Sequence, residues 1–154
     1  MSDSLPEPIS GMVVPRFVDQ ALSRGPLVVY DDGRQVRCFG HVADIVRGVL
    51  DLMRCPAAAG QVFNLGSDEA VSIRELAERV VRLVDPNLAI EHLPYARAYA
   101  PGFEDIRARV PDLTRIRTAI DYKPRYRLDD ILREVIAWKR QQGIVSATPS
   151  PPHS

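Results

Sequence analysis

The stretch LVVYDDGRQVRCFGHVADIVRGVLDLM, residues 27–53, is the most informative part of this chain. It begins with an apolar run, Leu27 to Tyr30, which predicts a short strand ending in the polar turn Asp31-Asp32-Gly33. Gln35 and Arg37 follow two positions apart, and side chains with that spacing share one face of a strand. Both can therefore reach one ligand, and the planar guanidinium of Arg37 is suited to binding a phosphate.

Apolar residues at helical spacing predict five helices, most of them with a recognisable end signal. The helices are expected at residues 14–22, 42–53, 73–84, 113–120 and 128–143. Gly25 is expected to close the first helix, Ser72 and Glu75 to form a capping box at the start of the third, and Asp112 to cap the fourth. Further strands are expected at Gln61–Leu65 and Ile90–Leu93. The elements together predict an α/β fold, a small mixed sheet with about five helices.

The composition is that of an ordinary globular protein. The chain has 154 residues, of which 45% are hydrophobic, and a formal net charge of zero, so no basic excess points to nucleic acid. No apolar run approaches the roughly 20 residues that span a bilayer. The first residues, MSDSLPEPIS, lack the features of a signal peptide. We therefore expect a cytoplasmic protein.

The two cysteines, Cys38 and Cys55, show no metal-ligand spacing and are expected to be reduced thiols. Residues 1–10 are expected to form a flexible N-terminus and residues 143–154 a disordered tail. These limits leave one domain, residues 11–142.

Two regions do not suit a self-contained domain. Residues 94–111 form a long loop with three arginines, and loops of that length are usually functional or disordered. The helix at 42–53 directly follows a strand and has an unbroken apolar stripe. We expect a large part of another polypeptide surface to pack on this stripe. This helix is expected to contact a cofactor-domain polypeptide or a second copy of the chain.

Four blocks of sequence carry a resemblance to a known family. They are GMVVPRFVDQAL (11–22), PLVVYDDGRQVRCFGHVADIVRGVLDLM (26–53), GQVFNLGSDEAVSIRELAERV (60–80) and RARVPDLTRIRTAIDYKP (107–124). In this order they resemble the C-terminal, substrate-binding half of NAD-dependent nucleotide-sugar epimerases and dehydratases, the extended short-chain dehydrogenase/reductase family. The UDP-glucuronate decarboxylase and UDP-glucose 4-epimerase group is the most similar. The resemblance covers roughly residues 11–140.

The family's cofactor and catalytic motifs are missing from this sequence. It contains no glycine-rich G-x-x-G-x-x-G turn, and none of its tyrosines has a lysine four residues on. The resemblance therefore implies a substrate-domain fragment without its Rossmann half, inactive alone, because NAD is bound by the absent half. A non-catalytic nucleotide-sugar binding module or a decayed relic remains the alternative. The sequence decides neither the sugar nor the choice between epimerase, decarboxylase and 4,6-dehydratase chemistry.

The resemblance also implies a UDP-binding site. Arg37, accompanied by Gln35, matches the family's diphosphate-binding arginine, and Arg109 matches a second arginine on the same diphosphate. Tyr30 matches the aromatic residue beside the base, although it can also be half-buried core. Asp112 can accept a hydrogen bond from the ribose, although helix capping explains it as well. A packed histidine at the strand–helix junction is expected at His41.

Overall fold

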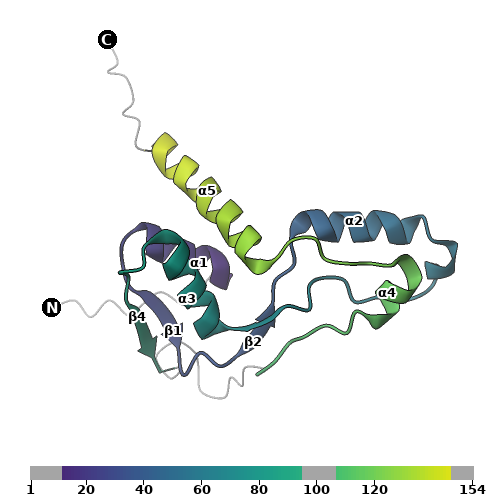
Figure 1. Cartoon of the computed structure of the whole chain (residues 1–154), viewed down its shortest axis with the longest axis horizontal. Coiled ribbons are helices and arrows are strands. Elements are labelled where there is room, and N and C mark those ends of the chain that lie inside the picture. Colours follow the sequence, from purple (N-terminus) through teal and green to yellow (C-terminus); the bar gives the residue numbers. More distant parts are fainter. Residues whose placement is uncertain (1–11, 95–106, 147–154) are drawn as a thin grey trace, which may run out of the picture. The chain divides into compact units, whose positions relative to one another are not determined.

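The structure is a computed structural model that describes residues 12–94 and 107–146. The expected flexible N-terminus at 1–10 lies outside these residues, as do most of the loop expected at 94–111 and the tail beyond residue 146. The described chain divides into two compact units. Unit 1 comprises residues 12–32, 76–94 and 132–146, and unit 2 comprises residues 33–75 and 107–131. Figure 1 labels most of the elements of the two units.

Unit 1 is built around a pair of parallel strands. β1 (Leu27–Tyr30) pairs with β4 (Ile90–Leu93) in the register Leu27 to Ile90 through Tyr30 to Leu93. α1 (Val13–Leu22) packs on β1, and α3 (Ile73–Val84) and α5 (Leu128–Ser146) contribute their later residues. The helical spacing of apolar residues in each helix supplies its buried face. The buried side chains of this unit are Val14, Phe17, Val18, Ala21, Leu27, Val29, Leu76, Ala77, Val80, Leu132 and Ile136.

The C-terminal end of α1 is closed by Arg24 where we expected Gly25. The N–H of Arg24 donates to the carbonyl of Ala21, and that of Gly25 donates to the carbonyl of Gln20, both at 3.1 Å. This is the hydrogen-bond pattern of a Schellman motif, in which the left-handed residue comes first. Arg24 holds that position with φ 57°, so Gly25 is one residue too late to supply the positive φ.

Unit 2 contains two strands and two full helices. β2 (Val36–Cys38) pairs antiparallel with β3 (Ala70–Ser72). α2 (Val42–Met53) leads into a short 3-10 helix, η1 (Pro56–Ala58), and contacts α4 (Thr114–Ile120). A buried cluster of Leu113, Ile116 and Tyr122 forms the core, with Leu52, Phe63, Leu65 and Ile120 packed against it.

The α/β class and the five helices are confirmed, and the strands lie in two separate pairs, one parallel and one antiparallel. The strand expected at Gln61–Leu65 is wrong, because this segment is irregular. Its polar groups bond to the 112–115 region instead. Asn64 Nδ2 donates to the carbonyl of Asp112 at 3.1 Å, and Arg115 donates to the carbonyl of Val62 at 2.9 Å.

The ends of the other helices follow the sequence closely. Ser72 Oγ accepts the N–H of Glu75 at 3.0 Å, which is the bond that a capping box requires of its first residue. α5 runs through Gly143 to Ser146, three residues beyond its expected end. In the described part of the chain, no helix has both the length and the apolar character needed to cross a bilayer.

Candidate functional site

Arg37 and Arg109 lie on neighbouring extended segments of unit 2. The N–H of Val36 donates to the carbonyl of Arg107 at 2.7 Å, and the N–H of Arg109 donates to the carbonyl of Val36 at 3.1 Å. These bonds pair Val36 with Ala108 in a parallel bridge. Because side chains alternate along extended backbone, the residues that follow this pair, Arg37 and Arg109, share the opposite face. Two segments whose paired residues are 72 positions apart in the sequence thus place two arginines on one face.

This placement has an electrostatic consequence. Paired segments lie about 4.8 Å apart, and like charges opposite each other destabilise a sheet. Arg37 is half-buried, and its Nη1 donates to the carbonyl of Val36 at 2.8 Å, whereas Arg109 is exposed. An anion placed over this face could accept charge-assisted hydrogen bonds from both guanidiniums. The face that carries Arg37 and Arg109 is therefore a candidate site for a phosphate-bearing ligand.

Gln35 and Asp112 occupy the same unit. Gln35 precedes β2, and its carbonyl accepts the N–H of Ile73 at 2.9 Å, which fixes its backbone beside the start of α3. Asp112 Oδ1 accepts the N–H of Thr114, the first residue of α4, at 2.9 Å, but the N-cap position of α4 is Leu113, one residue after Asp112. The hydrogen bond with Thr114 lowers the pKa of Asp112. A contact of Asp112 with a ribose stays a prediction.

Tyr30 belongs to unit 1, whereas the other four expected site residues belong to unit 2. It is the last residue of β1 and is half-buried. The guanidinium carbon of Arg16 lies 5.0 Å from the centre of its ring. Asp31 follows with φ 52°, in the left-handed region that few non-glycine residues adopt. Base stacking by Tyr30 stays a prediction.

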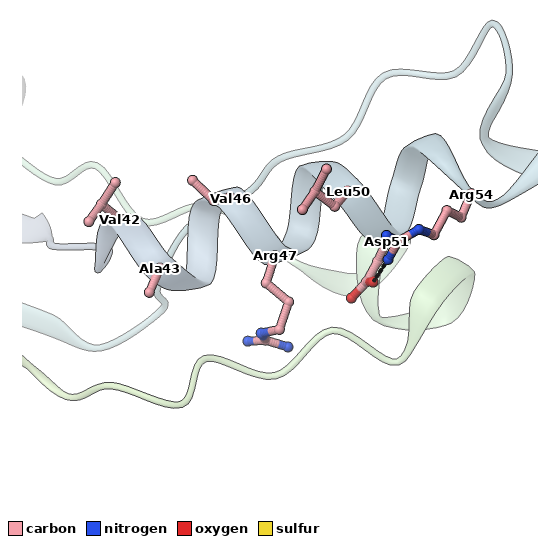
Figure 2. Close-up of a pocket in the computed structure, with 7 residues that line it drawn as sticks. All are labelled: Val42, Ala43, Val46, Arg47, Leu50, Asp51 and Arg54. Atoms are coloured by element: carbon pink, nitrogen blue, oxygen red, sulfur yellow. Dashed lines mark ion pairs between the residues drawn. The ribbon is translucent and has the colours of Figure 1, made fainter.

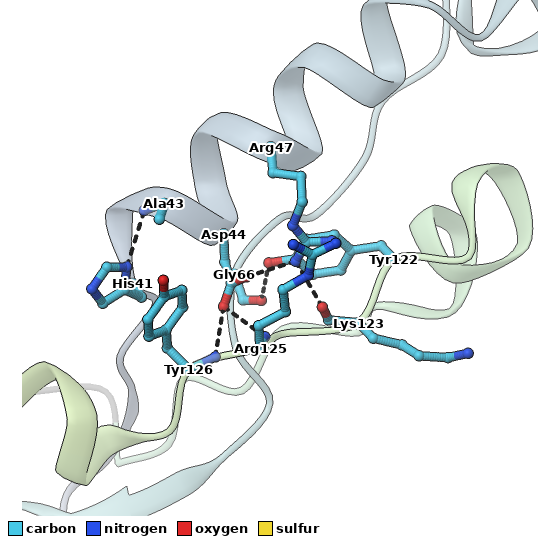
Figure 3. Close-up of polar contacts among 9 residues, drawn as sticks. All are labelled: His41, Ala43, Asp44, Arg47, Gly66, Tyr122, Lys123, Arg125 and Tyr126. Atoms are coloured by element: carbon cyan, nitrogen blue, oxygen red, sulfur yellow. Dashed lines mark hydrogen bonds and ion pairs between the residues drawn. The ribbon is translucent and has the colours of Figure 1, made fainter.

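A polar network around Asp44 was not anticipated from the sequence. Asp44 is buried in the first turn of α2, where it accepts hydrogen bonds from Arg47 at 2.6 Å and from the backbone N–H groups of Arg125 and Tyr126 at 2.8 and 3.1 Å. Burial alone would raise the pKa of Asp44, but these hydrogen bonds outweigh it and lower the pKa. Figure 3 shows this carboxylate between α2 and the 122–126 segment. The network anchors that segment to α2.

His41 and Tyr122 complete the network. His41 is buried, its Nδ1 accepts the N–H of Ala43 at 3.1 Å, and its ring stacks on Tyr126 with centroids 3.9 Å apart. The expectation of a packed histidine at this junction is confirmed. Tyr122 donates its hydroxyl to the carbonyl of Gly66 at 2.9 Å (Figure 3). Burial raises the pKa of Tyr122, as does the nearby carboxylate of Asp44.

α2 has the reverse of the usual amphipathic arrangement. Its buried positions are Asp44 and Gly48. Five of its apolar side chains are exposed and form a surface that we call the outer face of α2: Val42 (70% exposed), Val46 (52%), Val49 (44%), Leu50 (43%) and Met53 (78%). Figure 2 shows Val42, Val46 and Leu50 along one side of the helix. The expected apolar stripe is therefore exposed, apart from the half-buried Ile45.

A shallow pocket of about 400 Å³ runs along the same helix. Three side chains of the outer face contribute to it, and Arg47, Asp51 and Arg54 form its polar edge (Figure 2). An apolar strip with a charged rim is the usual anatomy of a protein–protein contact. Among the described residues, no group of three or more His, Cys, Asp or Glu side chains is placed to hold a metal ion.

Comparison with known proteins identifies the relatives of this chain. Residues 4–66 match the family model described as the NAD dependent epimerase/dehydratase family. UDP-N-acetyl-alpha-D-glucosaminuronate decarboxylase of Bacillus cytotoxicus is 36% identical over 129 residues, which cover 84% of this chain and 40% of that protein. The chain belongs to the NAD-dependent epimerase/dehydratase family. UDP-glucuronic acid decarboxylase 4 of Arabidopsis thaliana is 37% identical over 77% of this chain and 25% of its own length.

Solved structures agree on the fold. Epimerase Mth375 of Methanothermobacter thermautotrophicus superposes with a TM-score of 0.77 at 23% identity, covering 88% of this chain and 39% of that one. UDP-glucuronic acid 4-epimerase of Bacillus cereus, solved in complex with NAD, gives a TM-score of 0.71 at 23% identity and covers 85% and 40%. These structures share the fold of this chain, and the curated relatives above confirm the family that the sequence resembles. The chain spans 40% or less of the length of the two decarboxylases.

The described residues do not fit the NAD that this family uses. A dinucleotide pyrophosphate is bound by a glycine-rich turn between a parallel strand and the N-terminus of a helix. Here the parallel strand β1 is followed by Asp31 and Asp32, both exposed, and then by the strand β2. Two carboxylates in place of glycines would repel a pyrophosphate.

Proposed function

We propose that this chain is the nucleotide-sugar-binding, C-terminal portion of an NAD-dependent epimerase, dehydratase or decarboxylase, and that it binds the UDP moiety of the substrate. The observation that carries the proposal is the position of Arg37 and Arg109 on one face of paired segments. A diphosphate bears enough charge to engage two guanidiniums, and arginine forms the bidentate contacts that phosphate oxygens favour. The relatives named as UDP-sugar decarboxylases support the same substrate class.

The other expected contacts are assigned by the same resemblance. Gln35 accompanies Arg37 at the diphosphate, Tyr30 stacks on the uracil, and Asp112 accepts a ribose hydrogen bond. Asp112 Oδ1 already accepts the N–H of Thr114, so a ribose contact would add to this hydrogen bond. Arg37 and Arg109 are therefore expected to contribute most of the affinity, because charged contacts to an anion are the strongest of the set.

Isothermal titration calorimetry with UDP tests the site. Loss of one charge-assisted contact costs about 1.5–3 kcal/mol, so Arg37→Ala and Arg109→Ala should each weaken binding at least about tenfold. Arg140→Ala, which removes an exposed arginine from α5, is the matched control and should leave the affinity unchanged. Equal affinities for the wild type and both site variants would rule these arginines out.

We further propose that the outer face of α2 packs against the cofactor-binding portion of the enzyme. A stable homodimer usually buries about 800 Å² on each partner. α2 has 12 residues and is only about 18 Å long, so one such helix is too small to form a stable dimer alone. A full cofactor-binding domain offers the larger apolar surface that this face requires.

By itself the chain should not turn over a nucleotide sugar, because the glycine-rich turn and the Tyr-x-x-x-Lys pair are absent from its sequence. The assay is conversion of UDP-glucuronate or UDP-glucose with added NAD. Product formed in proportion to the purified chain would contradict this proposal. The alternative, a free-standing non-catalytic binder, is disfavoured by the exposed outer face of α2.

A further inference from the structure

Arg16 makes a specific contact with the aromatic residue that is expected beside the nucleobase. It is the fourth residue of α1, and its guanidinium carbon lies 5.0 Å from the centre of the Tyr30 ring and 5.2 Å from that of Phe17. Its Nη2 lies 3.5 Å from the carbonyl oxygen of Val28, two residues before Tyr30. Arg16 therefore links α1 to both the ring of Tyr30 and the strand that bears it, entirely within unit 1.

The contact restricts a side chain that would otherwise be mobile. Tyr30 ends β1 and is half-buried, and the turn that follows begins with Asp31 in the left-handed region. A planar guanidinium within 6 Å of an aromatic centroid is attracted to the negative face of the ring. Packing of the Arg16 guanidinium against Tyr30 restricts the orientation of its ring. The cation also offsets the negative charge of the ring face, which reduces repulsion from the π-face of a base.

We propose that Arg16 is a positioning residue for nucleobase binding, which acts by holding the ring of Tyr30 and does not itself contact the nucleotide. This inference rests on the proposed function, in which Tyr30 stacks on the uracil of a UDP-sugar. Phe17, the next residue of α1, is fully buried, and a substitution at Arg16 does not remove this core side chain.

The test is a double-mutant cycle with two ligands, UDP and inorganic pyrophosphate. The proteins are the wild type, Arg16→Gln, Tyr30→Leu and the double variant. Arg16→Gln should weaken UDP binding about three- to fivefold, the usual size of an exposed cation–π contact, and leave pyrophosphate binding unchanged. In the Tyr30→Leu background, the same substitution should have no effect on UDP binding. Arg16→Lys keeps the charge without the planar group and should restore only part of the affinity.

Each departure from this pattern has a definite meaning. Unchanged UDP affinity in Arg16→Gln would overturn the inference. A loss that persists in the Tyr30→Leu background would show that Arg16 contacts the nucleotide directly, which also overturns it. An equal loss for UDP and pyrophosphate would point to a general change of fold and would overturn it as well.

A ligand-free measurement separates this inference from the proposed function. In a chain with isotope-labelled tyrosine, Arg16→Gln should shift the ring resonances of Tyr30 and leave those of the buried Tyr122 in unit 2 unchanged. Tyr30 resonances that do not move would overturn the positioning role. Wild-type chain that binds neither UDP nor pyrophosphate would instead overturn the proposed function, and would do so even where the Tyr30 shift is observed.

Discussion

The carboxylate of Asp44 accepts a hydrogen bond from the backbone N–H of Tyr126 at 3.1 Å, although 82 positions separate the two residues in the sequence. The same oxygen accepts the N–H of Arg125 at 2.8 Å, and the other oxygen accepts from Arg47. One buried carboxylate thus satisfies two backbone donors of an irregular segment, whose burial without partners would be unfavourable. The segment between α4 and α5 is held to α2 by this residue.

Asp44→Ala should be among the most destabilising single changes in unit 2. It would leave the N–H groups of Arg125 and Tyr126 without their acceptor and Arg47 without its charged partner. We expect the free energy of unfolding to fall by about 3 kcal/mol, as is typical when one member of a buried charged network is removed. Urea denaturation followed by circular dichroism measures this change.

Asp51→Ala is the matched control for that experiment, because it removes a carboxylate from the same helix. Asp51 is 40% exposed at its side chain and lies 3.9 Å from Arg54, which is 75% exposed. A pair of this kind contributes less than about 1 kcal/mol. Similar effects of the two substitutions would mean that the hydrogen bonds of Asp44 do not stabilise the fold.

The acid dependence of stability should depend on Asp44 in a defined direction. The pKa of Asp44 is lowered in the folded chain, because the hydrogen bonds from Arg47, Tyr126 and Arg125 outweigh the raising effect of burial. The unfolded chain therefore binds the proton more readily. The stabilisation is complete above the unfolded pKa of about 4 and is lost as the pH falls through the lower, folded-state pKa.

We predict that Asp44→Asn flattens the fall in unfolding free energy below about pH 4. Some slope should remain, because the hydrogen bond from Arg117 lowers the pKa of Asp68 as well. The measurement is the urea midpoint of both proteins from pH 6 to pH 2.5. Parallel curves for the wild type and Asp44→Asn would show that this carboxylate does not titrate differently in the two states.

Local patterns predicted much of the fold, and long-range polar contacts explain what they missed. The apolar spacing in α1, α2 and α3 placed these helices within one or two residues. Asp44 was not recognised, because a lone acidic residue on the polar side of a helix is normally solvated. Its partners, Arg125 and Tyr126, lie on a segment without periodicity, so no local signal connects them to α2. The family resemblance alone predicts that Arg37 and Arg109 bind the same diphosphate, because no local pattern connects two positions so far apart in the sequence.

The failed strand at Gln61–Leu65 has a similar cause. Alternating side chains predict an extended segment, but a strand also needs a neighbour with free backbone groups. The residues beside this segment, Asp112 and Arg115, bond to it through the side chains of Asn64 and Arg115. The segment packs Phe63 and Leu65 on the core without forming a ladder.

Gly48→Ala tests the close approach of α2 to the core of unit 2. A Cβ on Gly48 would lie 2.5 Å from Cδ1 of Leu65 and 3.1 Å from the ring of Tyr122. Alanine favours a helix by about 1 kcal/mol over glycine, whereas overpacking a core costs about 1–3 kcal/mol. We expect a net loss of about 1 kcal/mol, because the ring of Tyr122 is fixed by its bond to Gly66 and cannot retreat. The free energy of unfolding in urea measures it.

Gly143→Ala provides the control, because Gly143 is also helical and a Cβ there would meet nothing within 4 Å. This variant should be stabilised by up to about 1 kcal/mol. Stabilisation of both glycine variants would mean that the contact between Gly48 and Leu65 relaxes without strain.

The outer face of α2 should make the purified chain associate weakly at high concentration. Exposed apolar surface drives association, and a helix of this length supplies too little of it for a tight dimer. We predict that the apparent molar mass from static light scattering rises with concentration. Val46→Lys should reduce that rise by placing a charge in the middle of the apolar surface. Its urea midpoint should stay unchanged, because Val46 is already 52% exposed.

Ala137→Lys is the matched control, because it adds the same charge at an exposed position of α5 and leaves the outer face of α2 intact. If both lysine variants lower association equally, net charge and not this face is responsible. A wild-type chain that stays monomeric at every concentration would argue that the face does not bind itself. The outer face of α2 would then have to be buried by a different polypeptide, as we propose for the cofactor-binding portion. Co-expression with such a portion should slow hydrogen exchange in α2 around Val46 and Leu50.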